Sequence, residues 1–399
     1  MNAKQSILAG LSTALGETAV TEGSPGFSVD GIVPGAVVRP KDYAGVATTL
    51  SFANENGLTV IPLGGRQHAH IGNLPTRYDV ALNLAALNAV VEFEPADLTI
   101  TVQAGLTLGE LRQTTAGSGL IIPFDPSAPD DATVGGMIAA GIFGAAAASL
   151  GTPRDFTIGL RVVMADGRMT RAGGKVVKNV AGYDLCKLYT GSVGTLGVIV
   201  EASLKALPSP PAEQRLNFAM DSAEQACSHV RSAFRAGLSI RSASMHRIPG
   251  GWSVHVVLAG TRAGVDRSYR EMATDTVASD DVSDPPQYPL EMMVTVLPSR
   301  LAGLLEELAA QLREAAIEAW PASGVCVIRT HDIEHSITTA MSLATMHQGT
   351  FTVPRCPFEI KTNRDVFGDE PSAAALIRQI KHEFDPKGTL SPGRGPGRI

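Results

Sequence analysis

The order of hydrophobic and polar positions near the N-terminus predicts alternating strands and helices. Residues 37–40 (VVRP) are typical of a strand that ends at a proline. Residues 41–57 place apolar side chains on one face at helical spacing, and Gly57 follows as a helix-ending glycine. Residues 58–63 (LTVIPL) predict a buried strand that runs into a glycine turn. The pattern therefore indicates an α/β unit.

A second group of elements follows. Residues 96–105 alternate as a strand, and Thr107 with Glu110 predicts a capping box at the start of a short helix. Residues 160–173 predict a hairpin that turns at Asp166-Gly167.

The pattern then predicts a short helix and a strand. Asp184 is expected to cap the helix, whose apolar face is formed by Leu185, Leu188 and Tyr189. The strand that begins after Gly197 is half-buried, and its expected core face is formed by Val198, Val200, Ala202 and Leu204.

The second half of the chain has a different pattern. Residues 207–211 (LPSPP) are typical of a domain boundary. Residues 252–260 predict a strand, and residues 279–289 predict a loop rich in aspartate and proline. A helix is expected at about 300–319, with a core stripe formed by Leu301, Leu304, Leu305, Leu308 and Leu312.

Composition limits the class of protein. The chain has 399 residues, of which 44% are hydrophobic and 18% charged, which suits a soluble protein of two or three domains. A formal net charge of −6 without a basic block argues against nucleic-acid binding. The four cysteines are scattered, which is typical of reduced thiols in the cytoplasm, and the N-terminus does not have the pattern of a signal peptide.

One segment raises the question of a membrane span. Residues 132–153 carry no charge over 22 positions. They are mostly glycine, alanine, serine and threonine, which gain little free energy from lipid. A buried segment of small residues is therefore favoured over a transmembrane helix.

Three segments are rich in glycine: residues 62–72, 133–144 and 173–197. Glycine lets backbone N–H groups bind anions and lets the backbone approach a flat ligand. Structural turns are the alternative explanation. Neither the G-x-G-x-x-G dinucleotide motif nor the Walker motif is present, so a bound phosphate would need another scaffold.

Several motifs in this order resemble the FAD-binding domain of the vanillyl-alcohol oxidase/PCMH superfamily. They are P-x-G-G from position 62, T-V-G-G at 133–136, G-T-P-R-D at 151–155, K-N-V-A-G-Y-D-L at 178–185 and G-S-V-G-T-L-G-V-I at 191–199. The resemblance covers roughly residues 33–208, and DPKGTLSPGR at 385–394 resembles the superfamily's C-terminal tail. Together with the length, KVVKNVAGYDL at 175–185 resembles most the FAD-binding, E-type subunits of bacterial glycolate oxidases.

The resemblance implies an α+β fold. A PCMH-type FAD-binding domain would occupy residues 24–208, with two α/β subdomains at about 24–102 and 103–208. A smaller α/β cap domain would follow at 209–384, and the tail at 385–399 would return to the flavin domain.

The resemblance also implies the residues that bind FAD. A pyrophosphate loop is expected at Gly64, Gly65, Arg66 and Gln67. Further contacts are expected from Thr133, Val134, Gly135, Gly136, Gly182, Tyr183, Gly194, Thr195, Gly197, Val198 and Ile199. For Tyr183 the alternative is a core tyrosine.

Other candidate chemistry is weaker. Non-covalent FAD is expected, although some members of the superfamily attach FAD through a histidine, and His68 and His70 lie near the loop. No metal site is expected: the H-G-D-G-N-x-H motif of related hydroxy-acid dehydrogenases is absent, and His331 and His335 lack a third ligand. A basic cluster near the third glycine segment could attract an anion or be a solvated face; it comprises Lys175, Lys178 and Lys187. No residue is identified as catalytic.

Three functional hypotheses remain open. The first is an FAD subunit that oxidises a 2-hydroxy acid, with glycolate favoured, by hydride transfer to flavin N5. Its partners would be a larger FAD-binding subunit and an iron–sulfur subunit, in the cytoplasm or held by partners at the inner face of the cytoplasmic membrane. The second is a stand-alone FAD dehydrogenase or oxidase. The third is a non-catalytic assembly subunit, supported by departures from the family pattern at residues 145–148 and at Ser391.

Overall fold

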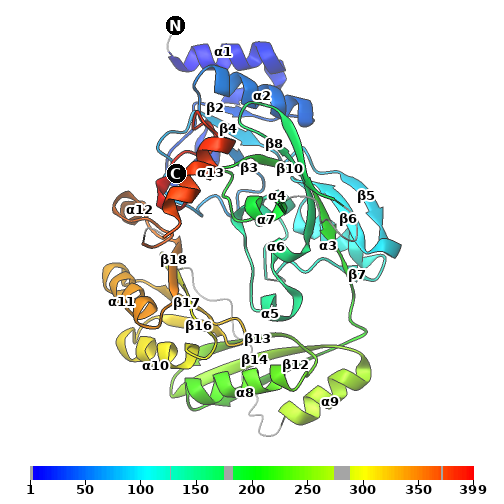
Figure 1. The fold of residues 1–399 in the computed structure, drawn as a ribbon, viewed down its shortest axis with the longest axis vertical. Coiled ribbons are helices and arrows are strands. Elements are labelled where there is room, and N and C mark those ends of the chain that lie inside the picture. The colour runs from blue at the N-terminus through cyan, green and yellow to red at the C-terminus, as the bar shows by residue number, and fades with distance from the viewer. Residues whose placement is uncertain (1–2, 126, 175–182, 274–287, 370–371) are drawn as a thin grey trace. The chain divides into compact units, whose positions relative to one another are not determined.

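A computed structural model describes residues 3–125, 127–174, 183–273, 288–369 and 372–399. The chain folds into two compact units. Unit 1 comprises Met1–Ile142, Thr152–Ser209 and Asp369–Ile399, and unit 2 comprises Phe143–Gly151 and Pro210–Gly368. Both units combine helices with sheets (Figure 1), so the expected α+β class is confirmed.

The first sheet of unit 1 has four strands, in the order β1 (Val20–Glu22), β2 (Ala36–Val38), β4 (Val80–Asn83) and β3 (Val60–Leu63). β4 pairs in parallel with both β2 and β3, while β1 is antiparallel to β2. Helix α2 (Tyr43–Glu55) connects β2 to β3 and begins where the carboxylate of Asp42 accepts a hydrogen bond from the amide of Gly45. Its apolar face packs on this sheet, and α1 (Ala3–Leu15) packs against α2.

The second sheet of unit 1 is antiparallel and has the order β5 (Val90–Glu94), β6 (Thr99–Gln103), β10 (Val198–Lys205), β8 (Thr157–Val163) and β9 (Met169–Gly173). The predicted capping box is confirmed: the hydroxyl of Thr107 and the carboxylate of Glu110 cap α3 (Leu108–Ala116) reciprocally. The predicted hairpin is also confirmed, because β8 and β9 pair and Gly167 in their turn has a positive φ of 85°.

The predicted core face of β10 is wrong in one respect. The register of β10 against β8 shifts between Ile199 and Glu201, which makes Val200 a bulge. Val198 and Val200 therefore pack in the core around α2, whereas Ala202 and Leu204 pack in a different core. After a bulge, alternate residues point to the opposite face of the sheet, although the alternation of apolar and polar residues in the sequence continues unchanged.

The remaining elements of unit 1 lie outside these two sheets. They are β7 (Leu120–Ile121), α4 (Val134–Ala140), α6 (Pro153–Phe156), α7 (Cys186–Tyr189), β11 (Leu207–Pro208) and α13 (Ala374–Phe384), together with four 3-10 turns at Glu17–Ala19, Pro25–Phe27, Pro95–Asp97 and Pro396–Arg398. Asp184 lies just before α7 and accepts a hydrogen bond from the amide of Cys186, one residue earlier than a formal N-cap.

Unit 2 contains one antiparallel sheet in the order β12 (Ala212–Met220), β14 (Gly251–Gly260), β13 (Ile240–Ile248), β16 (Ala316–Trp320), β17 (Val325–Thr330), β15 (Leu290–Thr295) and β18 (Thr350–Arg355). The four longest helices of unit 2 contribute to one core on this sheet: α8 (Ala223–Arg235), α9 (Arg262–Met272), α10 (Leu301–Gln311) and α11 (Ile333–Met346). Two further helices of this unit are α5 (Ala147–Leu150) and α12 (Phe358–Asn363).

The predicted helix at 300–319 is too long. Its leucine stripe is buried as expected, but α10 ends at Gln311 and residues 316–320 form strand β16. β16 lies between β13 and β17 and pairs with both, so long-range pairing overrides the helical tendency of its alanines and glutamate. The predicted strand at 252–260 is confirmed as β14. The expected loop at 279–289 lies mostly outside the described residues.

The unit boundaries differ from the expected domains in two places. Residues 143–151, which interrupt the predicted flavin domain, belong to unit 2 and are called the strap below. In the strap, Phe143 packs edge-on against Trp320 with ring centroids 5.8 Å apart, and the hydroxyl of Ser149 donates to the carbonyl of Arg241. Residues 369–384, expected in the cap, belong to unit 1 instead, since Ile380 and Phe384 pack in its core.

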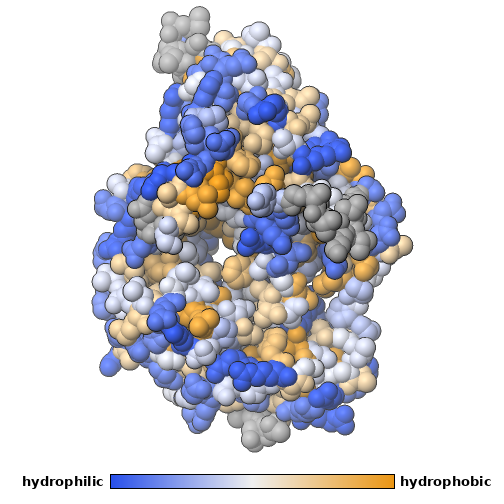
Figure 2. All heavy atoms as spheres, in the orientation of Figure 1, coloured by the Kyte–Doolittle hydropathy of each residue, from blue (hydrophilic) through white to orange (hydrophobic). Residues whose placement is uncertain are grey.

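The small-residue segment at 132–153 forms short helices joined by glycines rather than a long one. No helix in the described ranges combines the length and the apolar character that a membrane span requires. On the face drawn in Figure 2, hydrophilic residues are widely distributed and hydrophobic ones gather in separate patches.

We expect Gly167→Ala to destabilise the protein more than Gly57→Ala. Both glycines have a positive φ, 85° and 62°, so either alanine costs about 1–2 kcal/mol of backbone strain. An added Cβ at Gly167 would also lie 2.6 Å from the carbonyl oxygen of Ala47 in α2, whereas nothing lies within 4 Å at Gly57. Thermal unfolding measures the difference, and equal losses would contradict the close packing of the hairpin turn on α2.

Candidate functional site

A pocket in unit 1 collects most of the predicted cofactor residues. Its first wall is the loop after β3, its second is α4 with the residue before it, and its third is the segment that leads into β10. The predicted residues that line it are Gly64, Gly65, Arg66, Gln67, Thr133, Gly135, Gly136, Gly194, Gly197 and Ile199. Three segments far apart in the sequence therefore meet at one site.

The glycines of the first wall are required by close contact with the second wall. A Cβ on Gly64 would lie 2.1 Å from the hydroxyl oxygen of Thr133, and one on Gly65 would lie 2.1 Å from the carbonyl oxygen of Asp131. Real Cβ atoms do not approach other atoms so closely. A larger residue would have to displace the side chain of Thr133 at position 64 and backbone at position 65.

The third wall follows the same rule. A Cβ on Gly194, whose φ is 70°, would lie 2.8 Å from the ring of Pro62, and one on Gly197 would lie 2.4 Å from the side chain of Val162. These glycines serve the packing of the walls on their neighbours. Close packing, the structural explanation considered from the sequence, is therefore the reason that these positions are glycines. The pocket is the space that remains between the packed walls.

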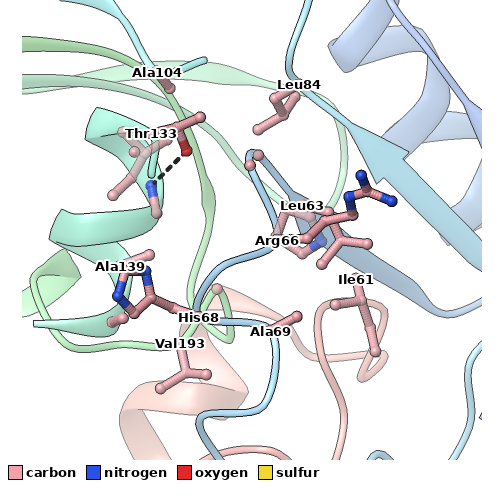
Figure 3. Close-up of a pocket in the computed structure, with 18 of the residues that line it drawn as sticks. Ile61, Leu63, Arg66, His68, Ala69, Leu84, Ala104, Thr133, Ala139 and Val193 are labelled. Atoms are coloured by element: carbon pink, nitrogen blue, oxygen red, sulfur yellow. Dashed lines mark hydrogen bonds between the residues drawn. The ribbon is translucent and has the colours of Figure 1, made fainter. Parts of the chain in front are cut away.

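Gly136 differs from its neighbour Gly135. A Cβ on Gly135 would lie 2.7 Å from the Cβ of Ala104, but one on Gly136 would meet only the hydroxyl oxygen of Thr133, at 3.1 Å. That hydroxyl is the N-cap of α4 and accepts from the amide of Gly136 (Figure 3). A side chain added at Gly136 would extend into open space beside the pocket.

The two polar residues of the first wall are held by other protein groups. Arg66, whose φ is 65°, donates to the carbonyl of Gly26, and its guanidinium lies over the ring of Phe27 at 5.0 Å from the centroid. In Figure 3 this guanidinium points away from Thr133 and Ala139. The amide of Gln67 donates to the carboxylate of Asp131. The loop reaches the pocket mainly through its backbone.

Some predicted residues lie elsewhere. Val134 and Val198 are fully buried in the core, and Thr195, although it belongs to the segment of the third wall, is 5% exposed and does not line the pocket. Tyr183 is 95% exposed and is neither a core tyrosine nor part of the pocket lining. Gly182 lies outside the described residues, as do Lys175 and Lys178, while Lys187 pairs with Asp184 at 3.6 Å.

The sequence prediction missed several lining residues. Most are small or apolar and carry no sequence signal: Ile61, Pro62, Leu63, Ala69, Leu84, Ala104, Ala139, Ala140 and Val193. His68 also lines the pocket, and its ring lies beside Ala139 in Figure 3. Arg394 lines it as well. Arg394 could have been predicted from the sequence, because it is the last residue of the tail motif at 385–394 that resembles the superfamily.

Arg394 is a buried cation at the edge of the pocket. It is 2% exposed, and its guanidinium donates to the carbonyl of Ala69 at 2.8 Å and to that of Ile71. The carboxylate of Asp30 lies 3.6 Å away. Burial lowers the pKa of Arg394, while Asp30 and Tyr78 act in the opposite direction. The first wall is therefore tied to the C-terminal tail.

The donor set fits a flavin cofactor. Glycine backbone and apolar side chains suit a flat ring system, and His68 and Arg394 are among the polar residues that line the pocket. Among the described residues, no group of three or more His, Cys, Asp or Glu side chains is arranged to hold a metal ion. His331 instead packs against Tyr288 with ring centroids 5.2 Å apart.

Unit 2 carries a separate polar row on its sheet. Arg329 donates to the carboxylates of Glu318 at 3.0 Å and Glu291 at 2.7 Å, and the indole of Trp320 donates to Glu318 at 2.8 Å. Burial raises the pKa of Glu318, but the bond from Trp320 and the charge of Arg329 outweigh it and lower the pKa overall. Arg329 thus bridges two carboxylates on neighbouring strands, which ties these strands of the sheet together.

Comparisons with known proteins agree with this geometry. Residues 34–173 match the model of a family described as FAD binding domain. The glycolate oxidase subunit GlcD of Bacillus subtilis (strain 168) is 35% identical over 184 residues, which cover 46% of this chain and 39% of the relative. The glycolate oxidase subunit GlcE of Escherichia coli (strain K12) is 37% identical over 182 residues, covering 45% and 51%.

A D-lactate dehydrogenase of Archaeoglobus fulgidus is 37% identical over 172 residues, covering 43% of this chain and 38% of the relative. The matches thus span about half or less of the length of these relatives. A solved structure of alkyldihydroxyacetonephosphate synthase has a TM-score of 0.67 at 15% identity and covers 90% of this chain and 76% of that one, which is a likeness of fold.

These matches confirm the expected cofactor class. The family match spans the first two walls of the pocket and part of the sheet behind the third. The chain therefore carries an FAD binding domain, and FAD is its cofactor.

We expect Gly136→Leu and Gly135→Ala to separate cofactor binding from stability. Leucine at 136 fills open space beside the pocket, so FAD affinity falls by about tenfold or more while the apoprotein keeps its melting temperature. Alanine at 135 collides with Ala104 and lowers the melting temperature of the apoprotein. Flavin fluorescence titration and thermal unfolding measure the two effects. Unchanged FAD affinity in Gly136→Leu would place the cofactor elsewhere.

Proposed function

We propose that this chain is the FAD-binding subunit of a 2-hydroxy-acid oxidoreductase that converts glycolate to glyoxylate. The observation that carries the proposal is the pocket itself, in which three glycine-rich walls meet within one unit. Relatives named as glycolate oxidase subunits support it, since each matches a little under half of this chain at 35–37% identity. The proposed partners are a larger FAD-binding subunit and an iron–sulfur subunit.

In this proposal the chain binds and orients the cofactor. The backbone of Gly64, Gly65, Gly135 and Gly136 would lie along FAD, and apolar side chains would exclude water from one face. The chemistry that FAD supplies is acceptance of a hydride at N5 from C2 of the hydroxy acid. The hydroxyl proton leaves to a base outside this chain, and the two electrons continue to the partner subunits. We place the complex in the cytoplasm or at the inner face of the cytoplasmic membrane.

A stand-alone dehydrogenase is the second candidate. It is favoured by the similarity to a D-lactate dehydrogenase, whose identity to this chain equals that of the E. coli subunit. The substrate would then bind without a partner subunit, and the same cofactor pocket would serve it. The two candidates differ in whether this chain reduces its flavin alone.

We expect the purified chain to be yellow and to keep its flavin spectrum when glycolate is added without oxygen. Addition of the larger FAD-binding subunit and the iron–sulfur subunit should make the spectrum bleach, because substrate oxidation then feeds electrons to the complex. Anaerobic spectrophotometry measures this. D-lactate and D-2-hydroxyglutarate serve as comparison substrates, and acid precipitation should release the flavin into the supernatant.

Two outcomes would change the assignment. Bleaching of the isolated chain by any of the three acids would support the stand-alone dehydrogenase. A colourless protein that takes up no added FAD would contradict both candidates and leave a subunit that only assembles a complex.

A further inference from the structure

The C-terminal segment of unit 1 contains a fully bonded buried ion pair. Lys381, near the end of α13, is 8% exposed, and Asp385, directly after the helix, is 2% exposed. The lysine Nζ donates to the carboxylate of Asp385 at 2.6 Å. It also donates to the carbonyl of Leu390 at 2.8 Å and to that of Thr195 at 2.8 Å. All three ammonium protons therefore have acceptors.

The carboxylate side of the pair shapes the tail. Asp385 accepts from the backbone amides of Thr389 at 2.9 Å and Leu390 at 2.7 Å as well as from Lys381. These bonds close the turn after α13 within the tail itself. The bond from Lys381 to Thr195 is different, because it joins α13 to the third wall of the pocket.

The tail continues from this turn to the first wall. The amide of Val60 donates to the carbonyl of Thr389 at 2.7 Å, and the amide of Ser391 donates back to the carbonyl of Val60 at 2.9 Å. These two bonds fix the tail along β3, which leads into the loop at Gly64. Arg394 then bonds the carbonyls of Ala69 and Ile71 in the same loop. The segment from Lys381 to Arg394, called the clasp here, thus bonds both walls.

We propose that Lys381 is a positioning residue of the cofactor site, which acts by holding the carbonyl of Thr195 and thereby the third wall. The inference rests on the proposed FAD binding, since its effect is exerted on that pocket. Thr195 lies between Gly194 and Gly197, which both line the pocket. The amides of Gly191 and Val193 hold the start of this segment on the carbonyls of Ile138 and Ala139 in α4. Lys381 holds it from the other side, at the carbonyl of Thr195.

The pair is not explained by the stability of the tail turn alone. Two backbone amides already satisfy Asp385, so the turn can close without the lysine. Burial lowers the pKa of Lys381 while Asp385 opposes that shift, which shows that the ammonium is held in the core at a desolvation cost. What the lysine adds beyond charge balance is the bond across to Thr195.

Three variants of the full chain test this. Lys381→Met removes the bond to Thr195 and also leaves the buried carboxylate of Asp385 without its cationic partner. It is therefore expected to lower both the melting temperature and the FAD affinity. The double variant Lys381→Met/Asp385→Asn also removes the unpaired negative charge of Asp385. Lys387→Met is the matched control, because this lysine is exposed in the same tail and donates to the carbonyl of Asn54.

We expect the double variant to recover part of the melting temperature lost in Lys381→Met, because the buried charge is gone while asparagine keeps one of the two oxygens that accept from the amides of Thr389 and Leu390. It should still bind FAD about tenfold or more weakly than the unmodified chain. Lys387→Met should match the unmodified chain in both readouts. Flavin fluorescence titration gives the affinity, and thermal unfolding of the apoprotein gives the stability.

Recovery of FAD affinity in the double variant would overturn the inference, because it would reduce the role of Lys381 to charge balance. If Lys381→Met does not fold, the double variant alone decides. Failure of the unmodified chain to bind FAD would contradict the proposed function instead, so the two failures are distinct.

Discussion

The structure of the site depends on the close approach of backbone segments that only glycine permits. At Gly64 the first wall touches Thr133 of the second wall, and at Gly65 it touches Asp131, two residues earlier, with no room for a Cβ at either position. At Gly197 the third wall lies against the side chain of Val162 in β8. Because these contacts are between parts of the protein, the walls take their positions from packing. The pocket is therefore formed before any ligand enters, which reduces the ordering cost of binding.

Because the walls of the pocket are rich in glycine, they depend on bonds from other parts of unit 1. Walls rich in glycine have few side chains with which to anchor themselves, so their anchors must come from elsewhere in the chain. The clasp supplies them as two buried cations that bond backbone carbonyls: Lys381 on the third wall and Arg394 on the first. Buried cations are costly unless they are paired or hydrogen-bonded. All three ammonium protons of Lys381 have acceptors, and Arg394 has the carboxylate of Asp30 at 3.6 Å beside its two carbonyl acceptors. Carbonyl oxygens of loops are suitable acceptors, because loops leave them unpaired.

Local patterns predicted much of the fold. The capping box at Thr107, the β8–β9 hairpin and the leucine stripe of α10 follow from short-range rules and are confirmed. The failures are long-range. Residues 316–320 have a composition that suits a helix, but the neighbouring strands on both sides make them a strand. The bulge at Val200 leaves the alternation of residue types unchanged and so cannot be read from it.

The candidate site also shows what local sequence patterns can and cannot predict. Motifs identified which segments meet, but not which side chains face the pocket. Arg66 belongs to the predicted loop, yet its guanidinium is bonded to Gly26 and stacked on Phe27. Tyr183 belongs to a predicted motif and is almost fully exposed. Lys381, in turn, sits in a helix whose sequence is that of an ordinary charged surface, and its role depends on acceptors 186 and 9 residues away.

The alanine run of the strap bears on the choice between the functional hypotheses. Residues 145–148 depart from the superfamily pattern, and that departure was the main support for a chain without a cofactor. In the structure the strap belongs to unit 2, where Phe143 and Ala145 pack against Trp320, Val325 and Val327. A small side chain at 145 allows the strap to lie close to the sheet. None of the residues described in the strap lines the pocket. Packing in unit 2 thus accounts for the small side chain at Ala145, and the strap leaves the argument for a flavin site in unit 1 intact.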